Sequence, residues 1–340
     1  MMGIYSEKQG FAKLSRIGSY FRSLIIGSAI AYSGAVSAAV AYPGDILIAD
    51  AQNRTTILGA VYNLNTTTNG LSLLASSPTI HQPEGVALDG SGNAYVVGFG
   101  GTNATDYGSI IQINLNTGAV STLVQGGMGV YRSGGGMIYD PAGFLVVAQQ
   151  GNSTIRGALV KVSLTDGSST LIGQQSGSVP NGVVITPDGN YFVSSFQGSP
   201  FYRVNRNTGV FTAVSVTGFT TPTYHISQDP FNPYSIIASS PTGIYSVNTQ
   251  TLASTLLVSG GYLTSTPSSS EIEDSNGNIY FTTSTGNIVQ YDHTLGTQTI
   301  VAALNRPVNL VFVPEPSSTL VLGGLVCILA TRRRRTSMAG

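Results

Sequence analysis

The sequence contains no tryptophan, a single cysteine and few charged side chains. Charged residues make up 9% of the 340 residues, and the one cysteine, Cys327, lies in an apolar segment near the C-terminus. The part of the chain between its two terminal apolar segments therefore has no disulfide and no thiol chemistry. Its stability must come from burial of apolar side chains, which a domain of about 270 residues can supply.

Basic residues are scarce in the middle of the chain. Fifteen basic and fifteen acidic residues cancel overall, but the two ends hold eight of the basic residues and only two acidic ones, Glu7 and Glu315. Residues 44–313 therefore keep seven basic and thirteen acidic groups, a difference of minus six, and Lys161 is the only lysine among them. An acidic, lysine-poor surface argues against nucleic acid as a partner.

The first 41 residues have the pattern of a secretory signal peptide. Four basic residues precede an apolar stretch from Leu24 to Val36, and small residues follow at 37–39 and 39–41. This order predicts export across the inner membrane and removal by signal peptidase, with cleavage after Ala41 preferred. An uncleaved N-terminal helix is the alternative, which the short apolar stretch and the small residues at its end disfavour.

The last 28 residues combine three unlike pieces in a fixed order. The first is the sequence Val313, Pro314, Glu315 and Pro316, whose two prolines cannot enter a helix and keep the segment extended. The second is an apolar run of about twelve residues, 319–330, which spans only a thinned bilayer or a tilted path. The third is a cluster of four arginines that holds the tail on the cytoplasmic side: Arg332, Arg333, Arg334 and Arg335.

This arrangement over residues 313–335 resembles the PEP-CTERM sorting signal of Gram-negative bacteria. The resemblance implies recognition and processing by the membrane protease exosortase. It predicts transient membrane insertion through a short C-terminal helix, followed by release to the cell surface or the medium. Such a signal gives the destination of the protein and not its activity.

Six units of similar length repeat between the two ends. In each, turn-forming residues precede a β-rich apolar run, with the key glycines at 44, 92, 143, 189 and 277 and a glycine-less fifth unit near Tyr234. The steps between the glycines are 48, 51 and 46 residues, then 88 across two units. Periods of this size without a helical pattern are typical of propeller blades of four strands.

Counting strands predicts how the ring closes. The first unit begins directly at its second strand, residues 45–49, while a spare strand remains after the sixth unit at residues 307–312. Placing the spare strand at the inner position of the first blade removes the open edges. Residues 42–312 are therefore predicted to form an all-β, six-bladed β-propeller closed by its C-terminal strand. A seven-bladed propeller and a pair of β-sandwiches are the alternatives.

Two stretches resemble the NHL and SMP-30/gluconolactonase-like group of six-bladed propellers. They are Pro180-Asn181-Gly182, continuing to Val193, and Gln82-Pro83-Glu84-Gly85. The resemblance implies a divalent metal such as calcium at the mouth of the central funnel, with Glu84 and Asn181 among its ligands. Calcium needs about six or more oxygens. The other inner strands offer the following polar residues, with no aspartate at the matching place in the fifth blade: Ser133, Tyr224, His225, Ser270, Glu271 and Asn309.

Three classes of function remain open. The first is a non-catalytic propeller that binds polysaccharide or protein of the extracellular or biofilm matrix, and low charge with seventeen tyrosines suits such contacts. The second is a metal-dependent hydrolase of the SMP-30/gluconolactonase type, acting through Glu84 and Asn181. The third is a polysaccharide lyase that uses His225 as base and Tyr224 as acid at the funnel. No triad order, nucleophile elbow or phosphate-binding loop assigns a catalytic residue.

Overall fold

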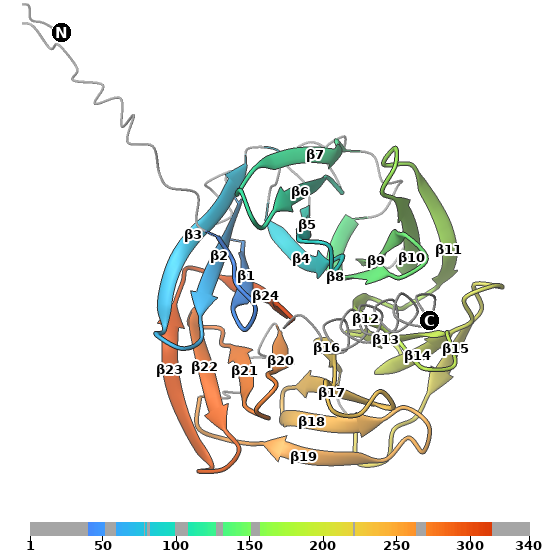
Figure 1. The fold of residues 1–340 in the computed structure, drawn as a ribbon. Helices are drawn as coiled ribbons and strands as arrows, with labels where there is room; N and C mark the ends of the chain where they lie inside the picture. The colour runs from blue at the N-terminus through green and yellow to red at the C-terminus, as the bar shows by residue number, and fades with distance from the viewer. Residues whose placement is uncertain are drawn as a thin grey trace, which may run out of the picture. The chain divides into compact units, whose positions relative to one another are not determined.

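The computed structural model describes residues 40–51, 59–77, 79, 82–98, 108–126, 132–150, 157–219, 222–262 and 270–314. Over these ranges the chain forms six four-stranded antiparallel sheets arranged around a common centre (Figure 1). Each sheet is a propeller blade with one strand innermost. The predicted all-β, six-bladed propeller is confirmed.

Every blade begins at the centre of the ring and adds its strands outward. From the centre, blade 1 consists of β24 (Pro307–Phe312), β1 (Ile46–Asp50), β2 (Gly59–Asn65) and β3 (Gly70–Ser77). Blade 2 consists of β4 (Pro83–Leu88), β5 (Asn93–Gly98), β6 (Ile110–Asn114) and β7 (Val120–Val124). Blade 3 consists of β8 (Arg132–Asp140), β9 (Phe144–Gln150), β10 (Gly157–Ser163) and β11 (Ser169–Gln175).

Blades 4 to 6 follow the same order. Blade 4 consists of β12 (Pro180–Ile185), β13 (Tyr191–Ser195), β14 (Phe201–Val204) and β15 (Phe211–Val214). Blade 5 consists of β16 (His225–Gln228), β17 (Ser235–Ser240), β18 (Gly243–Asn248) and β19 (Ser254–Val258). Blade 6 consists of β20 (Glu271–Glu273), β21 (Ile279–Thr282), β22 (Asn287–Asp292) and β23 (Thr297–Ala303).

The predicted closing strand is present in blade 1. β24 pairs with β1 in antiparallel register, with Ile46 opposite Phe312 and Ile48 opposite Leu310. The seam continues past the strand, because the amide of Val313 donates to the carbonyl of Asp45 (2.8 Å). The two ends of the domain therefore hold one another in a single sheet, and blade 1 is built from strands of both ends.

The turn between the third and fourth strands has one design in all six blades. A side-chain oxygen at the end of the third strand accepts a backbone N–H two or three residues later, as Asn114 does from Thr117 and Asp292 does from Leu295. Four residues after that side chain, the backbone has a positive φ of 56° to 70°, the region that favours glycine. Four blades use glycine there, and the other two use Asn69 and Leu252.

The apolar core lies between blades and not inside any one of them. Six clusters of buried side chains fill the six spaces between neighbouring blades. In the space that closes the ring, Ile46 and Leu310 of blade 1 pack with Ile272 and Tyr280 of blade 6. Strands buried on both faces explain why alternation of apolar and polar residues is weak in this sequence.

The predicted signal peptide up to residue 39, the apolar run 319–330 and the arginine cluster lie outside the described residues. So do Glu315 and Pro316, whereas Val313 and Pro314 are described. Within the described ranges, no helix has the length and hydropathy that crossing a bilayer requires.

Candidate functional site

The inner strands of the six blades bring six residues to one level of the central channel. Blades 2, 3 and 4 contribute glycines, of which Gly136 lies against Gly182, since a Cβ on Gly136 would come within 3.2 Å of the Gly182 Cα. Blades 5, 6 and 1 contribute His225, Glu271 and Asn309. A Cβ on Gly136 would also lie 3.6 Å from Nε2 of His225. Because glycine has no side chain, blades 2 to 4 leave room in the channel for the polar side chains of blades 5, 6 and 1.

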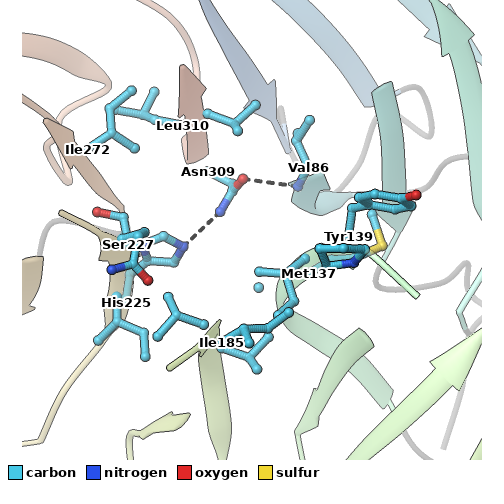
Figure 2. Close-up of a pocket in the computed structure, with 17 residues that line it drawn as sticks. Val86, Met137, Tyr139, Ile185, His225, Ser227, Ile272, Asn309 and Leu310 are labelled. Atoms are coloured by element: carbon cyan, nitrogen blue, oxygen red, sulfur yellow. Dashed lines mark hydrogen bonds between the residues drawn. The ribbon is translucent and has the colours of Figure 1, made fainter. Parts of the chain in front are cut away.

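Asn309 of the closing strand joins two other blades at this level. Its Oδ1 accepts the backbone N–H of Val86 in blade 2 at 3.0 Å, and its Nδ2 lies 2.9 Å from Nε2 of His225 in blade 5 (Figure 2). The side chain is buried. A buried polar group is costly unless it is hydrogen bonded, and both ends of this amide have partners.

The hydrogen bonds around Asn309 fix the tautomer of His225. The N–H of Val86 can only donate, so the amide oxygen must face it and the amide nitrogen must face His225. Since that nitrogen is itself a donor, Nε2 of His225 accepts and the ring proton resides on Nδ1. The imidazole is therefore neutral in this arrangement.

The protonated Nδ1 of His225 faces blade 6. It lies 3.4 Å from Oε1 of Glu271 and 3.4 Å from Oγ of Ser270. Ser270 in turn accepts the backbone N–H of Leu310 at 3.0 Å. His225, Glu271, Ser270 and Asn309 thus form one buried polar cluster, which we name the channel cluster, and it ties blades 2, 5 and 6 to the closing strand.

A pocket of about 340 Å³ adjoins the channel cluster. His225 and Asn309 contribute to its wall, and Figure 2 shows both among apolar side chains from the inner strands. It reaches Pro141, in the turn after β8, so it occupies the half of the channel that faces the turns between first and second strands. The remaining labelled side chains of Figure 2 are Val86, Met137, Tyr139, Ile185, Ser227, Ile272 and Leu310.

The predicted metal ligands lie one residue before the channel level. Asn181 precedes Gly182, and its Oδ1 accepts from Nε2 of Gln150 in blade 3 at 2.6 Å. Glu84 precedes Gly85 and is partly exposed in β4. Within the described ranges, no three His, Cys, Asp or Glu side chains lie close enough together to hold a metal ion. Neither Glu84 nor Asn181 therefore belongs to such a group. A divalent metal at Glu84 and Asn181 stays a prediction.

The two predicted funnel residues, Tyr224 and His225, have different surroundings. His225 lines the central pocket, whereas Tyr224 is absent from that lining and its ring centroid lies 5.2 Å from the ring of Phe196. Burial raises the pKa of the Tyr224 hydroxyl. The acid and base that a lyase mechanism needs are therefore not side by side in the pocket.

Sequence reasoning identifies Glu271 and Asn309 as polar residues at the starts of inner strands but does not join them to His225. Glu271 is 46 residues and Asn309 is 84 residues from His225 in the chain. The signal that could have joined them is positional. His225, Glu271 and Asn309 each directly precede an apolar residue of their inner strand. Gly85, Gly136 and Gly182 have the same position in the other three inner strands.

No protein-family model and no curated protein sequence matches this chain. Solved structures match it at low identity. A structure of a nidogen/laminin complex aligns with a TM-score of 0.61 and 13% identity, over 78% of this chain and 97% of that one. TolB from Acinetobacter baumannii aligns with a TM-score of 0.60 and 16% identity, over 80% of this chain and 67% of that one.

A third structure is described as a putative 6-phosphogluconolactonase from Bacteroides fragilis. It aligns with a TM-score of 0.53 and 12% identity, over 79% of this chain and 98% of that one. Identities this low carry information on the fold and none on a shared activity. The comparisons and the geometry agree that this chain is a six-bladed β-propeller.

Proposed function

We propose that this chain is an exported, exosortase-processed propeller that binds polysaccharide or protein of the extracellular matrix and has no catalytic activity. The observation that carries the non-catalytic part is the channel cluster. Nε2 of His225, the atom that would act as a base, already accepts from the amide of Asn309. The histidine and the glutamate are both buried. A general base must reach the proton that it removes, and here Nε2 of His225 is used to join blades.

The position of the sorting motif supports the processing part of the proposal. The ring makes its last backbone hydrogen bonds at Val313, which donates to Asp45 and accepts from Gly44. Pro314, the first residue of the Pro-Glu-Pro motif, follows directly. A protease that cuts after this point would release a complete ring, because all strands in the described part of the chain lie on the N-terminal side of the Pro-Glu-Pro motif.

The sorting proposal is tested by replacing Pro314, Glu315 and Pro316 with alanine. We expect the variant to stay in the membrane fraction while the parent protein is released, because the recognised motif is gone and the apolar run remains. Replacement of the exposed Asn305, which lies before the closing strand, is the matched control and should leave release unchanged. Normal release of the triple-alanine variant would refute the proposal.

The binding proposal is tested by screening the purified protein against a glycan array and matrix extract. A reproducible ligand without any turnover of lactone substrates is the expected result. Metal-dependent lactone hydrolysis that is lost on replacing Glu84 or Asn181 would instead establish the hydrolase function.

A further inference from the structure

A second cavity lies between blades 5 and 6, separate from the central pocket. It has a volume of about 570 Å³. Blade 5 supplies the turn after β16 and part of β19, and blade 6 supplies the turn after β20 and the end of β22. We call it the blade 5/6 groove. The residues on which the argument depends are Phe231, Leu256, Glu273, Asn276, Tyr291 and His293.

The groove presents aromatic and apolar surface to solvent. Phe231 is 60% exposed and Leu256 is 49% exposed. The loop that carries Phe231 is held in place, because the carboxylate of Asp229 accepts the backbone N–H of Phe231 at 2.8 Å. Tyr291 adds a second, partly buried ring to the lining. Exposed rings beside polar groups suit the apolar C–H faces of sugar rings, whose hydroxyls then meet the polar groups.

Carboxyl groups dominate the charge in and beside the groove. Its lining contains a carboxyl group, Glu273, and neither lysine nor arginine. Burial, together with the nearby carboxylates of Asp229 and Asp274, raises the pKa of Glu273 to about 7. His293, whose ring covers Gly277, is the one lining residue that could carry a positive charge. A cationic ligand group would relieve the repulsion among these carboxylates.

We propose that the blade 5/6 groove binds a glycan that contains amino sugars. Sugar rings lie on Phe231 and Tyr291, and an ammonium group of the glycan pairs with the carboxylate of Glu273. Asn276, on the exposed turn after β20, supplies an amide for the sugar hydroxyls. This assignment rests on the proposed matrix-binding function and names its ligand class and its site.

Charge complementarity decides among the glycan classes. A polysaccharide that carries carboxylates would be repelled by Glu273 and by the two aspartates beside it. A neutral polysaccharide would place no positive charge beside Glu273 and would gain nothing from the negative potential of this carboxyl group and its neighbours. Only a glycan with amines offers the groove a group of opposite sign.

The test compares two probes by calorimetry on the purified protein. They are a glucosamine oligosaccharide and its fully N-acetylated counterpart of the same length. We expect the amine-bearing probe to bind about five- to tenfold more tightly, the range of one partly exposed charged hydrogen bond. Glu273→Gln should abolish that preference, and Phe231→Ala should weaken both probes about tenfold. Asp166→Asn and Tyr42→Ala, which alter an exposed carboxylate and an exposed ring elsewhere, are the matched controls.

Each outcome bears on the proposal. Equal binding of the two probes, or binding unchanged in Glu273→Gln and Phe231→Ala, would overturn the groove assignment and leave the matrix-binding function in place. Absence of binding to both probes would overturn the amino-sugar assignment. The matrix-binding function itself fails only when the glycan array and matrix extract also give no ligand.

Discussion

The side-chain amide of Asn309, in the strand that closes the ring, lies 2.9 Å from Nε2 of His225, which is in the fifth blade. The same amide accepts the backbone N–H of Val86 in the second blade. One side chain thus connects three blades at the axis of the molecule. The residue at the seam between the chain ends is also the residue that fixes the protonation pattern of the channel.

Replacing Asn309 with alanine should destabilise the ring. The change leaves the N–H of Val86 and Nε2 of His225 without their partners in a buried place, and each unsatisfied group costs about 1–3 kcal/mol. We expect the free energy of unfolding, measured with urea, to fall by about 3 kcal/mol. The same change at the exposed Asn305 is the control and should cost less than about 0.5 kcal/mol.

Asn309→Asp tests the tautomer of His225. A carboxylate can accept from Val86 but cannot donate to Nε2, so His225 must place a proton on Nε2 to keep the contact. We expect the ring proton of His225 to move from Nδ1 to Nε2 in this variant, a change that the nitrogen chemical shifts of the ring report. Chemical shifts that place the proton on the same nitrogen in both proteins would contradict the assigned tautomer.

The fold could be predicted because its determinants are local and recur. A glycine or asparagine is favoured wherever the outer hairpin turn needs a positive φ, and the six turns place such positions at 69, 118, 167, 209, 252 and 296. Leu252 breaks the rule because its side chain also packs against the core between blades 4 and 5. Closure follows from counting strands, since β1 has no inner neighbour before it in the chain and 307–312 is left over.

The channel cluster could not be predicted in the same way because its members meet only in the ring. His225 and Glu271 lie in different blades, and their contact depends on the register of β16 against β17 and of β20 against β21. In the sequence each is an isolated polar residue. The sequence also directs attention to Glu84 and Asn181, which stand one residue earlier, where side chains point away from the channel level.

Stability should decline with rising pH because of Glu273. Its pKa is about 7 in the folded protein against an ordinary value of 4.5, so the folded state holds a proton that the unfolded chain has released between these values. Stability is therefore lost as the pH rises through this window. Glu273→Gln should match the parent protein at pH 5 and exceed it by about 1 kcal/mol at pH 8, a figure reduced for solvent screening.

Asp166→Asn provides the control for that profile. Hydrogen bonds to Ser163 and Ser168 lower the pKa of Asp166 below its ordinary value of 3.8, so it stays ionised throughout the range from pH 5 to pH 8. Its difference from the parent protein should be constant over that range. A constant difference for Glu273→Gln as well would show that Glu273 does not titrate near neutrality.

Truncation within the C-terminal region should separate the ring from the sorting signal. A stop after Val313 keeps β24 and the hydrogen bonds between Val313 and blade 1, so we expect a monomeric protein with the melting temperature of the processed form.

A stop after Arg306 removes β24 and leaves an edge of β1 unpaired at the centre of the molecule. Exposed edges pair with other chains, so light scattering should detect aggregation of the shorter protein. A soluble, cooperatively folding protein that ends at Arg306 would contradict closure by β24.

The predicted cleavage after Ala41 has a structural consequence at Asp45. The buried carboxylate of Asp45 accepts the backbone N–H of Tyr42 at 2.9 Å and the amide of Asn63 at 2.7 Å. In a protein that begins at Tyr42, the N–H becomes an ammonium, and the hydrogen bond to the carboxylate becomes an ion pair. Cleavage after Ala39 would instead keep an uncharged amide there and would retain Ala41, which is buried in the core between blades 1 and 2.

A double-mutant cycle tests the ion pair between the Tyr42 ammonium and Asp45. Asp45→Asn should destabilise a protein that begins at Tyr42 by about 1 kcal/mol more than one that begins at Val40, because only the first loses an ion pair. The loss of Ala41 works in the opposite direction, so the shorter parent protein need not be the more stable one. The informative quantity is the difference between the two effects of Asp45→Asn, read from urea unfolding at neutral pH. Equal effects in both backgrounds would mean that the ammonium of Tyr42 does not reach Asp45.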